Sequence, residues 1–313
     1  MPQTKPTGPI AILGATSQIA KDFILQAHNA FAPEFLLYAR SPEKVEAFLA
    51  AHQLRHPVFP LSAFGQHDCA AILHFVGVGD PARAKSMGAE IFDVTLATDQ
   101  QALAYVAANP ATRYVFMSSG AVYGTDYEQP VNDATAAVVP LNDLQPQHYY
   151  GVAKLYAEAR HRALPQNTII DLRIFSYISR SLDLGTRFLM ADLANALRNK
   201  TVFRTDDQEI YRDFLHPSDF CQLIQACLTA PPGTNQALDV YSLAPIGKKE
   251  LLRALQERFG LKVEITPSIN AVHATGRKPY YYSESRRAEA LGYRPRYTSR
   301  DAIVEEMNFI LAS

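Results

Sequence analysis

Three side chains that can take part in proton transfer stand at informative positions. Ser119 follows an apolar run at 114–117 that is typical of a buried strand, and Tyr150 and Lys154 open a later segment with helical spacing. Residues four apart share one face of a helix, so both side chains can point into one cleft. A free phenol, with a pKa of about 10, is a poor base at neutral pH, but a nearby ammonium favours the phenolate. The trio therefore predicts general acid–base chemistry at a substrate oxygen.

The segments that must position these side chains alternate between strand and helix over the first half of the chain. Apolar runs predict strands at 9–13, 35–38, 70–76, 114–117 and 168–175. Helical periodicity predicts helices at 19–28, 42–52, 93–108 and 150–163. Ser41 is expected to cap the helix that starts at residue 42. This alternation predicts an α/β fold with a Rossmann-type, doubly wound parallel sheet.

The turn after the first strand is a candidate dinucleotide site. Parallel sheets bind ligands beyond the carboxyl ends of their strands, where the N–H groups that start the first helix face a diphosphate. Of a full glycine fingerprint only Gly14 is present, and an ordinary tight turn is an equal alternative for this segment taken alone. The expected cofactor contacts are Gly14, Thr16, Ser17, Gln18 and Ile19.

The end of the second strand favours NADP over NAD. It reads Tyr38-Ala39-Arg40-Ser41, with no acidic residue to bind an adenosine ribose. The guanidinium of Arg40 stands where a 2′-phosphate would lie, and its planar fork suits phosphate oxygens. A solvated arginine at a strand end is the alternative. We expect NADP, bound by Arg40 and Ser41, with NAD as the less favoured cofactor.

The regular alternation of predicted strands and helices ends after residue 175. Helices expected at 187–198, 218–228 and 248–259 are separated by short strands and proline-rich turns. We therefore expect a dinucleotide-binding Rossmann domain over 1–175 and a smaller C-terminal α/β lobe over 176–313 that binds the substrate. The boundary is approximate, and elements can interleave across it.

Several motifs occur in an order that matches a known family. They are Ile72-Leu73-His74-Phe75-Val76-Gly77, Ser119, Tyr150-x-x-x-Lys154 and Arg212-Asp213-Phe214-Leu215-His216-Pro217-Ser218-Asp219. In this order the chain resembles the extended short-chain dehydrogenases/reductases, in the nucleotide-sugar epimerase and dehydratase branch, over nearly its whole length. The resemblance implies that Ser119, Tyr150 and Lys154 are catalytic. It also implies that Phe75, Val76 and Gly77 lie near the nicotinamide and that Lys154 holds its ribose.

The resemblance further implies a nucleotide-sugar substrate. Arg212 and Arg277 match positions where the family often binds the substrate diphosphate, and Arg187 starts a helix that can border the same cleft. Ser119 would hydrogen-bond the reacting oxygen. The match at Arg277 is loose, because three tyrosines and Ser283 follow where the family usually has an aspartate. A solvated surface charge is the alternative role for these arginines.

The residues after the serine bear on the reaction. Dehydratases of the family usually carry an Asp-Glu pair there, whereas this chain has Gly120 and Ala121, which disfavours dehydration. A preference for NADP favours net reduction of a 4-keto-sugar over epimerisation. The alternatives are a nucleotide-sugar epimerase, a reductase of a non-sugar carbonyl, and a non-catalytic NADP-sensing protein. Relatives of the last kind typically lack the tyrosine and the lysine that are both present here.

Composition argues against several other classes. The 30 Lys and Arg nearly balance the 31 Asp and Glu, so there is no overall field to recruit nucleic acid or an anionic membrane. Cys69, Cys221 and Cys227 form no disulfide framework, and no segment has the apolar length of a membrane span. His148 and His216 have no partner at metal-ligand spacing, so no metal is expected. We expect a cytoplasmic enzyme and, from the resemblance alone, a homodimer.

Overall fold

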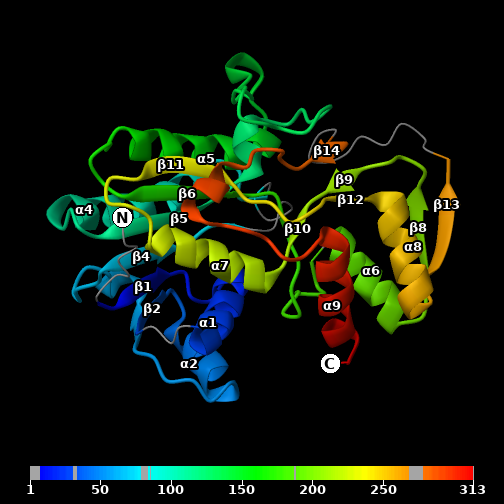
Figure 1. Ribbon diagram of the computed structural model, residues 1–313, viewed down its shortest axis with the longest axis horizontal. Coiled ribbons are helices and arrows are strands. Elements are labelled where there is room, and N and C mark those ends of the chain that lie inside the picture. Colours follow the sequence, from blue (N-terminus) through cyan, green and yellow to red (C-terminus); the bar gives the residue numbers. More distant parts are fainter. Residues whose placement is uncertain are drawn as a thin grey trace.

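The computed structural model describes residues 8–30, 34–78, 84, 86–186, 188–267 and 278–312 (Figure 1). Within these residues the largest sheet has seven strands in the order β11-β6-β5-β4-β1-β2-β3, and all of its pairings are parallel. The chain winds one way from β1 to β3 and the other way from β4 onward. This reversal is the topological switch point at which doubly wound sheets bind their ligands. The predicted fold class is confirmed.

The central strands of this sheet are short apolar runs buried on both faces, as expected for strands covered by helices on either side. The seven are β1 (Ile10–Leu13), β2 (Phe35–Ala39), β3 (Val58–Pro60), β4 (Ala71–His74), β5 (Arg113–Ser119), β6 (Ile169–Ile174) and β11 (Asn235–Asp239). The sequence predicted five of them. β3 was missed because its three residues are too short for a periodic pattern.

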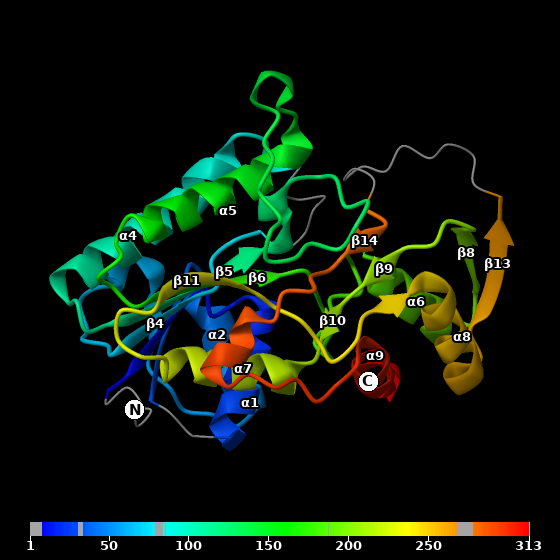
Figure 2. The ribbon, with the colours of Figure 1, turned by 45° about the horizontal axis from the view of Figure 1, so that its top comes forward.

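Helices cover the two faces of the sheet. α4 (Glu90–Ala108) and α5 (Pro146–Arg162) pack together on one face. α1 (Gln18–Ala30), α2 (Pro42–Ala51) and α7 (Pro217–Leu228) lie on the other, as Figures 1 and 2 show. Ser41 occupies the predicted N-cap position of α2, although its side chain makes no capping hydrogen bond. Pro42 at the first helical position already removes one of the donors that a cap would satisfy.

The C-terminal part of the chain builds a second apolar core and also returns to the first. Its own elements are β7 (Ser176–Tyr177), α6 (Leu189–Arg198), β8 (Val202–Asp206), β9 (Tyr211–Arg212), β10 (Phe214–Leu215), β12 (Ile246–Gly247), α8 (Lys248–Phe259), β13 (Lys262–Thr266), β14 (Tyr280–Tyr281) and α9 (Ser299–Ala312). Because α7 packs on α1 and β11 pairs with β6, the two parts interleave. No helix in the described part of the chain is both long enough and apolar enough to cross a membrane.

Candidate active site

The end of β5 and the start of α5 bring Ser119 and Tyr150 together. A short 3-10 helix, η2 (Gly120–Tyr123), follows β5 and packs against α5. This close packing requires Gly151, because a Cβ at that position would overlap the carbonyl oxygen of Ala121. Ser119 is buried, its hydroxyl accepts the Ala121 N–H at 3.2 Å, and it lies close enough to the Tyr150 phenol to lower the pKa of that phenol. The serine and the phenol therefore share one small space.

Lys154 lies deeper than the other two residues. Its ammonium donates to the carbonyl oxygen of Met117 at 2.8 Å and lies 4.2 Å from the ring centroid of Phe116. Burial lowers the pKa of Lys154 to about 8, although Asp99 is the first of several carboxylates that act in the opposite direction. A Cβ at Gly77 would lie 3.4 Å from the lysine nitrogen. Lys154 thus borders the loop after β4.

The phenol of Tyr150 is held protonated at neutral pH. Burial raises its pKa to about 12, the phenol of Tyr281 adds to the shift, and the hydrogen bond to Ser119 acts against it. In the chain by itself the Lys154 ammonium donates to the Met117 carbonyl, and our expectation that Lys154 and a bound nicotinamide together lower this pKa stays a prediction. A phenol in this environment keeps its proton at neutral pH, and its use as a base requires a further positive charge nearby.

A second phenol, which the sequence did not single out, faces the same serine. The hydroxyl of Tyr281, on β14, lies 3.5 Å from that of Ser119. β14 pairs with β9, in a register that places Tyr281 opposite Arg212. The signal for this residue was the run of three tyrosines at 280–282. The sequence could not show which of these tyrosines contacts Ser119, because that contact joins segments that are far apart in the chain.

Two partly buried cations flank the Tyr281 ring, at 5.8 Å for the Arg212 guanidinium and 4.8 Å for the Lys278 ammonium. Burial lowers the pKa of Arg212 to about 10, and burial followed by repulsion from Arg212 lowers that of Lys278 to about 8. Arg212 donates to the carbonyl oxygens of Tyr211 and Lys278 at 2.7 and 2.8 Å. Neither cation forms an ion pair with a described residue. Arg187 and Arg277, the other predicted substrate residues, lie outside the described residues.

The turn after β1 fits a dinucleotide. Gly14 has a φ of +82°, and a Cβ there would lie 2.8 Å from the Val76 nitrogen, so a glycine is required where β1 approaches the end of β4. α1 starts at Gln18, and the Ser17 hydroxyl accepts the Ala20 N–H at 3.2 Å. The N–H groups of this first turn lie at the carboxyl edge of the sheet, where a diphosphate can accept hydrogen bonds.

The remaining predicted cofactor residues surround this turn. Thr16 lies within it, partly buried, and Phe75 and Val76 follow β4 toward Gly77. Arg40 stands exposed at the end of β2, with no ion pair among the described residues. An exposed cation at this strand end is free to meet a phosphate.

His216 meets two carboxylates that its sequence neighbours did not reveal. Its Nε2 lies 3.4 Å from Glu306 and 3.5 Å from Glu305, both on α9. Glu306, however, also accepts two hydrogen bonds from the Arg180 guanidinium, at 2.7 and 3.1 Å. With Arg180 occupying this carboxylate, the group is an ion-pair network that ties α9 to the segment after β7.

The fold and the grouped hydroxyls and lysine define a class, the extended short-chain dehydrogenases/reductases, which are enzymes that use a nicotinamide dinucleotide. The model of the NAD dependent epimerase/dehydratase family matches residues 10–242, and the chain belongs to this family. A search of the curated proteins finds no match.

Solved structures of nucleotide-sugar enzymes share the fold. UDP-glucose 4-epimerase from Stenotrophomonas maltophila, with bound NAD and formylated UDP-arabinopyranose, is 16% identical with a TM-score of 0.81, covering 97% of this chain and 98% of its own. UDP-glucose 4-epimerase from Bifidobacterium longum, with NAD+ and UDP, is 18% identical at a TM-score of 0.74, with coverages of 96% and 97%. UDP-glucuronic acid 4-epimerase from Bacillus cereus, with UDP-glucuronic acid and NAD, is 16% identical at 0.76, with coverages of 96% and 98%.

Proposed function

We propose that this enzyme uses NADP(H) to reduce the keto group of a nucleotide-linked 4-keto-sugar, with Ser119, Tyr150 and Lys154 as its catalytic residues. The observation that carries the proposal is the grouping of Ser119, Tyr150 and the buried Lys154 at the carboxyl edge of the sheet, where the end of β5 packs against α5. Two donors can then bind one carbonyl oxygen, at the place where doubly wound sheets bind dinucleotides.

Each side chain has a separate task in this mechanism. A bound nicotinamide dinucleotide supplies the hydride. Tyr150, whose pKa of about 12 keeps it protonated, gives its proton to the carbonyl oxygen, and Ser119 donates a hydrogen bond to the same atom. Lys154, beside Gly77, binds the ribose of the cofactor. In the oxidative direction Tyr150 takes the proton back from the alcohol.

The cations near Tyr281 support a substrate that carries a diphosphate. Arg212 and Lys278 are partly buried cations without a carboxylate partner in the described part of the chain. A diphosphate would supply the missing negative charge through charge-assisted hydrogen bonds. Arg212 and Arg277 are the proposed diphosphate ligands, and Arg187 is proposed to border the same cleft.

The packing of Gly120 argues against dehydration. A Cβ at this position would lie 2.5 Å from the ring of Phe175, so an aspartate next to the serine would require that ring to move. The residue type and the packing at Gly120 therefore both disfavour the acidic pair that the resemblance associates with loss of water.

Epimerisation is the second candidate, and the structural neighbours favour it. Those described above are epimerases with NAD bound. The choice depends on Arg40, because a reductase draws on NADPH whereas an epimerase regenerates its own cofactor. We propose NADP on the strength of this exposed cation and of the missing acidic residue at the end of β2.

Cofactor titration tests the proposed NADP preference. Arg40→Ala should weaken NADPH binding at least tenfold and leave NADH binding nearly unchanged, because only NADPH carries the 2′-phosphate. Fluorescence of the reduced nicotinamide gives both affinities. Equal losses for the two cofactors would remove Arg40 from this role.

Substrate assays separate reduction from epimerisation. The enzyme should consume NADPH, followed by its absorbance, when mixed with a panel of nucleotide-linked 4-keto-sugars. Conversion of UDP-glucose without net consumption of cofactor would establish the epimerase instead. Consumption with small aldehydes alone would identify a reductase of a non-sugar carbonyl.

We propose the cellular location and the oligomeric state of the enzyme from its sequence. The balanced charge and the absence of paired cysteines support a cytoplasmic location. The family resemblance supports a homodimer, which light scattering measures directly.

A further inference from the structure

Tyr281 is a phenol at the catalytic serine that the proposed mechanism leaves without a task. Its hydroxyl lies 3.5 Å from the hydroxyl of Ser119. Ser119 and Tyr150 come from β5 and α5, whereas Tyr281 lies on β14, in the C-terminal part of the chain. The second lobe therefore brings a hydroxyl of its own to the place where the reacting oxygen is expected.

The other phenols of the same aromatic cluster already have acceptors for their protons. Tyr127, whose ring centroid lies 4.8 Å from that of Tyr281, donates to the carbonyl oxygen of Gly120. Tyr123 donates to the carboxylate of Asp239 at 2.9 Å. These two hydroxyls hold segments of the fold together, whereas the hydroxyl of Tyr281 faces a serine that is proposed to act on substrate.

The Tyr281 ring is held in position before any substrate binds. Tyr127 and Phe175 pack against it edge-on, at centroid distances of 4.8 and 5.2 Å. Burial raises the pKa of Tyr281, and although Ser119 and then Arg212 act in the opposite direction, the phenol stays protonated at neutral pH. Tyr281 is thus a preorganised hydrogen-bond donor, and such a donor needs little rearrangement to bind a developing negative charge.

Hydrogen-bond accounting leaves a proton for a ligand at this place. The hydroxyl of Ser119 lies between the phenols of Tyr281 and Tyr150, and two contacts of this kind use at most two of the three hydroxyl protons. A carbonyl oxygen has two lone pairs, and it gains a third as hydride reaches its carbon. Three donors around one oxygen therefore suit the transition state better than the bound substrate.

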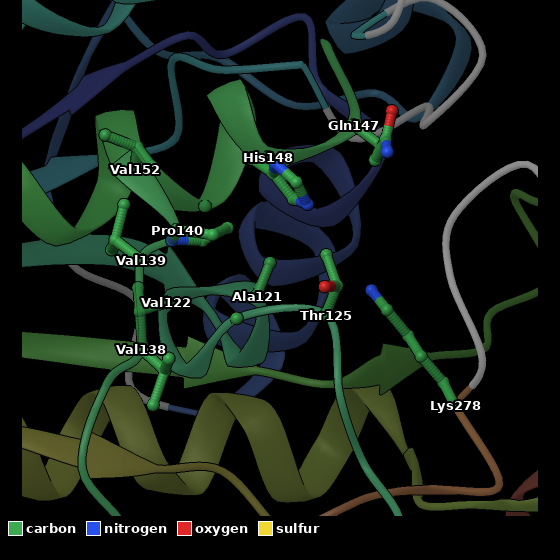
Figure 3. A pocket seen from close by; sticks show the side chains of 12 residues that line it. Ala121, Val122, Thr125, Val138, Val139, Pro140, Gln147, His148, Val152 and Lys278 are labelled. Carbon is green, nitrogen blue, oxygen red and sulfur yellow. The ribbon is translucent and has the colours of Figure 1, made fainter. Parts of the chain in front are cut away.

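The small pocket between η2 and the start of α5 is a different space (Figure 3). Its volume is about 30 Å³, and Ser119, Tyr150 and Tyr281 are not among the described residues that line it. An oxygen bound by the three hydroxyls therefore does not occupy this pocket.

We propose that Tyr281 is a further catalytic residue, which donates a hydrogen bond to the reacting oxygen together with Ser119. The inference rests on the proposed function and adds a residue of the C-terminal part to its mechanism. As hydride reaches the carbonyl carbon, an electron pair of the C=O bond moves to the oxygen. Tyr150 gives its proton to that oxygen, whereas Ser119 and Tyr281 keep their protons and stabilise the charge by hydrogen bonds.

Kinetics of two neighbouring variants test this role. Tyr281→Phe keeps the ring and removes the hydroxyl, so kcat should fall at least tenfold, while KM and NADPH affinity change less than about threefold. Tyr280→Phe, whose ring stacks on Tyr211 at 5.2 Å, is the matched control and should have normal kinetics. The measurement uses the nucleotide-linked sugar that the enzyme converts, by reduction or by epimerisation. A normal kcat for Tyr281→Phe, or a change in KM alone, would overturn the proposal.

Fluorine NMR keeps this inference separate from the proposed function, because it needs no turnover. With 3-fluorotyrosine in place of Tyr281, the signal of the NADP+-loaded enzyme should shift more on addition of UDP-glucose than on addition of UDP, which has no sugar oxygen. The same label in place of Tyr280 should not distinguish the two ligands. This result in an enzyme that reduces no keto-sugar would support the role of Tyr281 and contradict the proposed reduction. Equal responses of the label at position 281 to UDP-glucose and UDP would overturn the role of Tyr281, whatever reaction the enzyme catalyses.

Discussion

The charged groups at the two ends of α5 differ in whether they have ion-pair partners. Toward its C-terminus, His161 lies between two carboxylates, with its ring nitrogens 2.6 Å from Asp171 and 2.8 Å from Asp99. Arg160 pairs with Asp99 at 2.9 Å and Arg162 with Asp171 at 2.7 Å, so each of these charged groups has an opposite partner. At the N-terminal end the neighbouring cations, Lys154, Arg212 and Lys278, have no ion pair among the described residues.

We interpret the paired charges as groups that stabilise the fold, and the unpaired cations as groups that bind an anionic ligand. Burial of an ion is costly, and a carboxylate at hydrogen-bond distance offsets most of that cost within the folded chain. Glu158, between the two ends of α5, belongs to the paired group, because Arg173 donates to its Oε2 atom at 2.6 Å and to its Oε1 atom at 3.1 Å. The cations near Tyr281 have no such compensation, which is why we place substrate anions there. Variants at the two ends should therefore have different consequences.

The largest effect is expected at Tyr150. Tyr150→Phe removes the proton donor and keeps the ring, so turnover should fall by about 10²–10⁴-fold, while dinucleotide affinity and melting temperature stay close to normal. Steady-state kinetics and a cofactor titration measure the two quantities. A near-normal rate would remove Tyr150 from catalysis and leave the N-terminal end of α5 without its proposed chemistry.

At the paired end the expected loss is in stability. His161→Leu leaves Asp99 and Asp171 without the imidazole between them, and the free energy of unfolding should fall by about 3–5 kcal/mol. Urea unfolding followed by circular dichroism measures it. His161→Gln, which retains hydrogen-bonding groups, should recover part of the loss. A change below about 1 kcal/mol would mean that these contacts do not hold α5 in place.

The same histidine should make stability depend on pH. Burial acts to lower the pKa of His161, but Asp171 and then Asp99 outweigh it and raise the pKa to about 9, above the unfolded value of about 6.5. Its contribution is therefore complete below pH 6.5 and is lost as the pH rises through about 9. Melting temperatures from pH 6 to 10 should fall more steeply for the unmodified enzyme than for His161→Gln. Parallel curves would assign the pH dependence to other groups.

The smallest effect, and one of opposite sign, is expected at the unpaired end. Lys278→Met replaces an uncompensated ammonium by an apolar chain, so it should stabilise the protein by about 1 kcal/mol at pH 7. Burial lowers the pKa of Lys278 to about 8, below the unfolded value. The cost of the charge is thus full below pH 8 and is relieved as the pH rises through the unfolded pKa, where the advantage of methionine should vanish. A loss of stability at pH 7 would mean that Lys278 is paired.

Much of the central sheet was predictable because each strand is a local apolar run between turn residues. Contacts between residues that are distant in the sequence could not be predicted. β11 carries no sign that it would pair with β6, and Tyr281 reaches Ser119 only because β14 pairs with β9. The predicted roles of Ser119, Tyr150 and Lys154 remain predictions, although the structure places the three side chains at one edge of the sheet.

Local pattern determined which segments become strands and helices, and the four-residue spacing determined that Tyr150 and Lys154 share a helix face. Tertiary structure decided the electrostatics of the site. Whether a lysine contacts an aspartate, as the buried Lys248 does, or two aromatic rings, as the partly buried Lys278 does, depends on segments that are far apart in the chain. Local sequence does not reveal these partners, because the energy of a buried charge depends on the groups that surround it in space.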